Sequence, residues 1–117
     1  MGGTDAIDYA VLDGVLDSVG GDREFLAELI QVYLDDSPGL LAAMRAALDA
    51  REPGEFRRAA HSLKSSSASL GAMRLSSLAR ELEEMGKAGV LDGAETGVSQ
   101  AEAEYAQVSA ALQAAGA

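Results

Sequence analysis

The sequence contains no cysteine and no tryptophan, and its 117 residues include a single histidine, His61. The absence of cysteine excludes disulfides and thiolate metal sites, and it fits a reducing compartment. One histidine is too few for a histidine-rich metal site. We therefore expect no metal or cofactor that the chain itself would bind.

Long apolar runs are also missing. No stretch approaches the roughly 20 apolar residues that span a bilayer, and residues 1–5 lack the basic and apolar regions of a secretory signal. These absences predict a cytoplasmic protein. A net charge of −10 would repel nucleic acid and anionic membranes, so we expect protein or small-molecule partners.

Aromatic residues are scarce, with two Phe and three Tyr, although 48% of the chain is hydrophobic. The core must therefore be built from Leu, Ala, Val, Ile and Met, which is typical of a helical bundle. No segment alternates β-branched and polar residues as a half-buried strand would. We predict an all-α protein with one domain over residues 1–117.

Apolar residues recur at helical spacing from the start of the chain. A short helix is expected over residues 7–16, and paired glycines end it at residues 18–21. A second helix begins after Asp22, a suitable N-cap, and contains Pro38. Proline removes a backbone donor, so we expect a kink or brief break near Ser37, which would cap the second half.

Three more helices follow in the second half of the chain. They are expected over about residues 55–70, closing on Gly71, over residues 75–85, and over residues 98–112. The connections between them are short, which favours antiparallel neighbours. The predicted architecture is an antiparallel four-helix bundle with a short extra N-terminal helix.

The helix expected over residues 55–70 carries His61. At about 100° per residue its apolar side chains fall on one arc, and His61 points about 140° from the centre of that arc. The histidine should therefore face solvent. It is surrounded on the helical wheel by cationic and small side chains: Arg57, Arg58, Lys64, Ser65 and Ala68.

This patch favours chemistry on an anionic group. A neutral imidazole is a good nucleophile at cellular pH, and a phosphorylated ring nitrogen can pass its phosphoryl group to a carboxylate. Lys64, one turn along the helix, can bring its ammonium to a phosphate. Ser65 and Ala68 are small and leave room for another protein to approach His61.

Residues 60–72 resemble the motif of the histidine-containing phosphotransfer (HPt) domain of two-component phosphorelays. The family has an alanine-histidine pair, a small or polar residue, an apolar residue, lysine, glycine, several small residues, an apolar residue and glycine. This chain matches nearly every position, except that Ser65 replaces the glycine after the lysine. We expect docking to survive this change. Segments 20–26 and 78–83 resemble the family's flanking helices.

The resemblance implies that His61 accepts a phosphoryl group from a receiver-domain aspartate and donates it to another receiver domain, with Lys64 stabilising the phosphate. It also implies docking of response-regulator receivers, and of a (hybrid) histidine kinase, on the patch formed by Arg57, Arg58, Ser65 and Ala68. No phosphate-binding glycine loop is present, so we expect a phosphocarrier without kinase activity. We also expect the protein to be a monomer. The Mg²⁺ for transfer would reside in the partner receiver.

Some of these charged residues also have purely structural interpretations. Arg57 and Arg58 would equally serve as a solvated face pairing with Glu55. Glu81, Glu83 and Glu84 suggest a carboxylate pair, but Glu81 and Glu84 are ordinary helix formers with no histidine or metal-ligand partner in the sequence, and we interpret them as structural. For the whole chain, the alternatives are a receiver-binding or dimerisation bundle without phosphotransfer, or a histidine-kinase dimerisation domain. The last of these normally precedes an ATP-binding domain.

Overall fold

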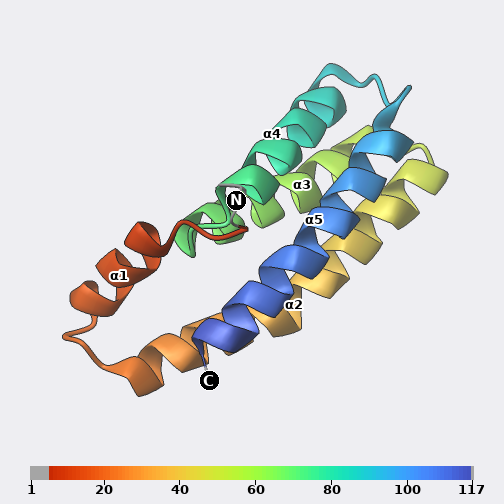
Figure 1. The fold of residues 1–117 in the computed structure, drawn as a ribbon. Helices are drawn as coiled ribbons and strands as arrows, with labels where there is room; N and C mark the ends of the chain where they lie inside the picture. The colour runs from red at the N-terminus through yellow and green to blue at the C-terminus, as the bar shows by residue number, and fades with distance from the viewer. Residues whose placement is uncertain (1–5, 117) are drawn as a thin grey trace.

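The computed structural model describes residues 6–116, and this part of the chain contains five α-helices and no β-strand. The helices are α1 (Tyr9–Ser18), α2 (Arg23–Asp49), α3 (Pro53–Ser69), α4 (Met73–Ala88) and α5 (Ala94–Ala115). Figure 1 shows α2 to α5 as long helices lying side by side, with α1 across from the first turns of α2. The predicted all-α class is confirmed.

The four long helices form a ring of antiparallel neighbours. Helix α3 packs between α2 and α4, and α5 closes the ring against α2 and α4 (Figure 1). The predicted antiparallel four-helix bundle with a short N-terminal helix is therefore confirmed. Within residues 6–116, no helix is long and apolar enough to cross a membrane.

The core is aliphatic, as the scarcity of aromatic residues requires. Phe56 on α3 is the one fully buried phenylalanine, and it lies among leucine, valine, alanine and methionine side chains. Close packing of such side chains is the main favourable term in a helical bundle. The largest members with 2% exposure or less are Ile7, Met44, Phe56, Leu63, Leu75, Leu82, Val98, Val108 and Leu112.

Pro38 does not break α2, so of the predicted kink or brief break near Ser37 the break is wrong. The helix is continuous from Arg23 to Asp49, and Ser37 is buried and donates its hydroxyl to Tyr33 O at 2.7 Å instead of capping a second helix. Proline has no N–H for the carbonyl four residues earlier, Leu34 O. The hydroxyl of Tyr105 on α5 donates to this carbonyl at 3.4 Å. Tertiary contacts thus supply the donor that proline removes.

The segment before α1 is tied to the turn between α3 and α4. The N–H of Asp8 donates to Gly71 O at 2.8 Å, and Ile7 is only 1% exposed. Gly71 has φ +85°, and a Cβ there would lie 2.6 Å from Asp8 O. Only glycine adopts this positive φ without strain and also leaves room for Asp8 O. The turn can therefore hold the hydrogen bond that anchors the start of α1.

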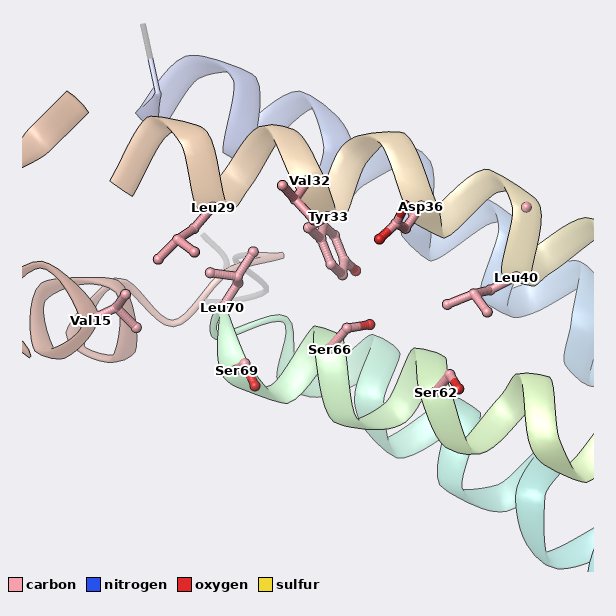
Figure 2. A pocket seen from close by; sticks show the side chains of 11 residues that line it. Val15, Leu29, Val32, Tyr33, Asp36, Leu40, Ser62, Ser66, Ser69 and Leu70 are labelled. Carbon is pink, nitrogen blue, oxygen red and sulfur yellow. The ribbon is translucent and has the colours of Figure 1, made fainter. Parts of the chain in front are cut away.

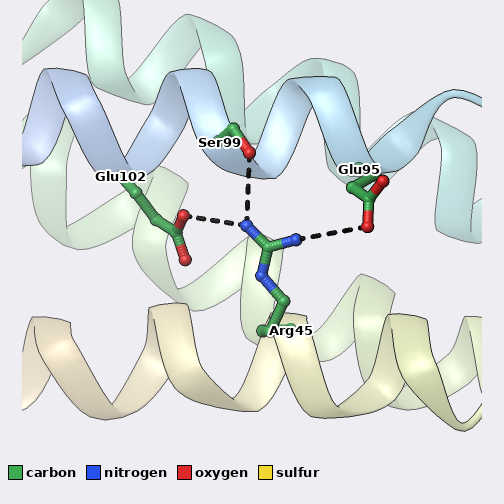
Figure 3. A network of polar contacts seen from close by, with 4 residues as sticks. All are labelled: Arg45, Glu95, Ser99 and Glu102. Carbon is green, nitrogen blue, oxygen red and sulfur yellow. Dashed lines mark hydrogen bonds and ion pairs between the residues drawn. The ribbon is translucent and has the colours of Figure 1, made fainter.

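A polar cluster joins α2 to α5 on the surface (Figure 3). Arg45 Nη2 lies 2.8 Å from Glu102 Oε1 and 3.3 Å from Ser99 Oγ, while its Nη1 lies 3.9 Å from Glu95 Oε2. The contact with Glu102 raises the pKa of Arg45 above its ordinary value. One guanidinium therefore bridges α2 and α5 at the surface.

Candidate functional site

His61 lies on the solvent side of α3, as the helical wheel predicts. The opposite face of α3 is buried, with Phe56, Ala60 and Leu63 at 0% exposure. In contrast, the side chain of His61 is 59% exposed. The burial of the apolar face against α2 and α4 therefore sets the direction of the imidazole.

Glu83 on α4 accepts a hydrogen bond from His61. The two atoms, His61 Nδ1 and Glu83 Oε2, are 2.6 Å apart. An ionised carboxylate only accepts hydrogen bonds, so Nδ1 must carry the hydrogen. In the neutral ring, Nε2 then keeps its lone pair. The carboxylate thus selects the tautomer in which the nitrogen on the far side of the ring is nucleophilic.

Lys64 binds the other oxygen of the same carboxylate. Its Nζ lies 2.7 Å from Glu83 Oε1, an atom that is closed off from solvent. The hydrogen bond from Lys64 lowers the pKa of Glu83 below its ordinary value of 4.5, aided by His61 and opposed by burial. The Glu83 side chain is 11% exposed and remains ionised at neutral pH because these two donors compensate its charge.

The close approach of α3 and α4 makes these short distances possible. A Cβ on Gly86 of α4 would lie 2.9 Å from the Cα of Arg57 on α3, so the helix backbones nearly touch there. Further along, Ser76 Oγ donates to Lys64 O at 2.9 Å. Glu83 lies between these two contacts and is held beside His61.

The other predicted site residues lie on α3 around His61. Arg57 and Ser65 are exposed, and Ala68 is partly buried. Arg58 is exposed and pairs with Glu55 at 2.8 Å, which is the ordinary surface pairing considered for it. No side-chain hydrogen bond or ion pair joins these residues to His61 within residues 6–116, so their surface position agrees with a docking face without testing that role.

A groove of about 680 Å³ lies between α2 and α3, the helix that carries His61, and reaches α1. Its walls carry mainly apolar side chains, including Leu29, Val32 and Leu40 of α2, as Figure 2 shows. Ser62, the residue after His61, lies on the α3 wall. The groove therefore reaches the residue that follows His61 in the chain.

The sequence patterns did not connect Glu83 with His61, whereas the structure places Glu83 in contact with both His61 and Lys64. A signal for this role was present in the sequence. Glu83 occupies one stripe of α4 with Ser76, Ala79 and Gly86 at steps of three and four residues. A lone acidic residue in a stripe of small residues faces a neighbouring helix and needs a polar partner there.

The geometry has counterparts in known proteins. The family model for the Hpt domain matches residues 28–111. Histidine-containing phosphotransfer protein 2 of Arabidopsis thaliana is 29% identical over 96 residues, which are 80% of this chain and 62% of that protein. This chain thus spans 62% of the length of that relative.

Two solved structures share the fold. Histidine-containing phosphotransfer protein B (HptB) of Pseudomonas aeruginosa PAO1 superimposes with a TM-score of 0.88 and 28% identity, covering 97% of this chain and 96% of that one. The HPT domain of a sensor hybrid histidine kinase from Shewanella gives a TM-score of 0.72 at 19% identity over 87% and 88% of the two chains. The chain belongs to the Hpt domain family.

Proposed function

We propose that His61 accepts a phosphoryl group from the aspartyl phosphate of one receiver domain and donates it to the aspartate of another. The observation that carries this proposal is the short contact between His61 Nδ1 and the ionised Glu83. It leaves Nε2 with a lone pair on an exposed ring. A histidine that merely packed on the surface would need no buried carboxylate behind it.

In the proposed transfer, Nε2 of His61 attacks the phosphorus of the aspartyl phosphate. The Nε2–P bond forms as the bond from phosphorus to the carboxylate oxygen breaks, and the aspartate leaves as its carboxylate. Glu83 keeps the Nδ1 hydrogen in place and stabilises positive charge that develops on the ring. The return step to a second aspartate is the reverse of the first. The chain thus contributes position and charge, and the required divalent cation belongs to the receiver.

Lys64 serves two anions in this proposal. An ammonium has three N–H donors, and its Nζ forms an ion pair with Glu83 Oε1 at 2.7 Å. The Lys64 side chain is 28% exposed, so its remaining donors are open to phosphoryl oxygens on His61. The same cation then orients Glu83 before transfer and offsets phosphate charge after it.

The receiver docks, in this proposal, over both the α3 patch and the groove beside it. The patch around His61 supplies positive charge from Arg57 and Arg58 and close access over Ser65 and Ala68. The groove supplies the apolar area that a specific interface needs at its centre. The two are continuous through Ser62.

The proposal is tested by mixing the protein with receiver domains phosphorylated by acetyl phosphate and following acid-labile phosphate on the chain. We expect phosphate on the wild type and none on His61→Gln, with circular dichroism showing the same helix content for both. Phosphate that remains on His61→Gln would overturn the assignment of His61. Receiver binding by the wild type without transfer would instead support the rival view of a binding bundle.

A further inference from the structure

The groove between α2 and α3 contains one charge that nothing in the described chain balances. Eleven residues line the groove, and Asp36 on α2 is the only charged one among them. Figure 2 shows its carboxylate on the α2 wall, between Tyr33 and Leu40 and across from Ser62 and Ser66. An otherwise uncharged groove thus has a single negative group on one wall.

Asp36 differs in this respect from the carboxylate next to it. Asp35 accepts a hydrogen bond from Gln31 Nε2 at 2.8 Å. Within residues 6–116, no ion pair or side-chain hydrogen bond involves Asp36. Both side chains are exposed, but only Asp36 lines the groove. Water is therefore what stabilises the Asp36 charge in the free protein.

A protein docked on His61 would change this environment. Ser62 and Ser66 on the opposite wall lie on the same helix as His61, one of them directly after it. A partner of ordinary interface size, about 800 Å² on each side, would cover the groove as well as the imidazole. Covering a carboxylate with apolar surface removes its water and is costly unless the partner supplies a cation.

We propose that Asp36 is a specificity-determining residue of the docking face. Receivers that place a lysine or arginine over the groove are accepted as partners. Receivers that place an apolar or acidic side chain there are rejected, because the carboxylate would be buried without a counter-charge. This inference rests on the proposed function, since it concerns the partner that exchanges phosphate with His61.

The test compares two neighbouring charge reversals. A panel of phosphorylated receiver domains is first ranked by the rate of transfer to the wild type, and the fastest receiver is kept. We then expect Asp36→Lys to lower the second-order rate constant by about tenfold or more, and Asp35→Lys to change it by less than about twofold. Both variants change the net charge equally on the same helix, so Asp35→Lys controls for long-range electrostatics.

A neutral variant and a charge swap complete the experiment. Asp36→Asn should lower the rate less than Asp36→Lys and should weaken its dependence on salt. Replacing the receiver's facing cation by glutamate should restore transfer to Asp36→Lys. Equal effects of Asp36→Lys and Asp35→Lys, or an unchanged rate for both, would overturn the specificity role. Failure of every receiver to phosphorylate the wild type would overturn the proposed function itself, and this inference with it.

Discussion

At the scale of single residues, the site consists of one carboxylate, Glu83, between two side chains of α3, His61 and Lys64. The Glu83 carboxylate has two oxygens, of which Oε2 accepts a hydrogen bond from His61 Nδ1–H and Oε1 forms an ion pair with Lys64 Nζ. Because Glu83 is almost fully buried, loss of either donor would leave an oxygen without compensation. Glu83 therefore positions His61 and Lys64 together.

Removing the charge of Glu83 should slow phosphoryl transfer while leaving docking intact. Glu83→Gln can place its amide so that it donates to Nδ1, which favours the wrong tautomer of His61. We expect the rate constant for transfer within the bound complex to fall about tenfold or more, with little change in receiver affinity. Rapid-quench kinetics at saturating receiver separate the two quantities. Glu84→Gln, an exposed neighbour, should match the wild type, and a purely weaker affinity for Glu83→Gln would contradict the positioning role.

The same residue makes folding stability depend on pH. The pKa of Glu83 is lowered in the folded state, chiefly by Lys64, relative to its ordinary value of 4.5. Its contribution is therefore complete above about pH 4.5 and is lost as the pH falls through the lower pKa of the folded state. Urea unfolding should show the stability gap between wild type and Glu83→Gln shrinking from about pH 7 to about pH 3. For Glu84→Gln we expect no comparable shrinkage, and a gap that widens in acid would refute the assignment.

At the scale of helices, the spacing of α3 and α4 controls the site. Ala at position 86 would put its Cβ 2.8 Å from the Cβ of Arg57, one turn before His61. The helices would have to separate, at a cost of about 1–3 kcal/mol. We expect Gly86→Ala to lower both the urea midpoint and the transfer rate. The control is Gly14→Ala on α1, where a Cβ would meet no atom within 4 Å, and it should be neutral or stabilising. If Gly86→Ala were equally neutral, the contact between α3 and α4 would tolerate the wider helix spacing.

The continuity of α2 depends on a donor from α5. Tyr105 donates its hydroxyl to Leu34 O, the carbonyl that Pro38 leaves without a backbone donor. Tyr105→Phe should therefore cost about 0.5–1.5 kcal/mol in the wild type and less when Pro38→Ala restores the N–H. A double-mutant cycle in urea measures this difference. Additive effects would mean that Tyr105 stabilises α2 only by packing.

The sequence predicted those features that depend on local spacing. Helical periodicity and turn glycines gave the five helices, and the wheel of α3 gave the direction of His61. The break at Pro38 was wrong because the compensating donor, Tyr105, lies 71 residues away from Leu34. Glu83 was missed for the same reason, being 22 residues from His61 on another helix. Contacts across the bundle depend on which helices become neighbours, which local patterns do not specify.

At the scale of the whole molecule, charge and shape act together. The described chain measures 43 × 29 × 19 Å along its principal axes, while the full chain carries a net charge of −10. Most of its ion pairs lie at the surface and contribute little individually. Repulsion between carboxylates spread over such a small body opposes folding.

Salt should therefore stabilise the fold at neutral pH. Raising NaCl from about 0.01 M to about 0.15 M shortens the Debye length from roughly 30 Å to roughly 8 Å. The first length is comparable with the size of the molecule, and the second with the distance between neighbouring surface charges. Repulsion across the bundle is then screened, whereas the buried Glu83 contacts are affected less. We expect the thermal midpoint to rise with NaCl at neutral pH and to change little near the isoelectric point of about 4.3, where net repulsion vanishes. A midpoint that falls with salt at neutral pH would mean that attractive surface pairs, such as Arg45 with Glu102, outweigh the net repulsion.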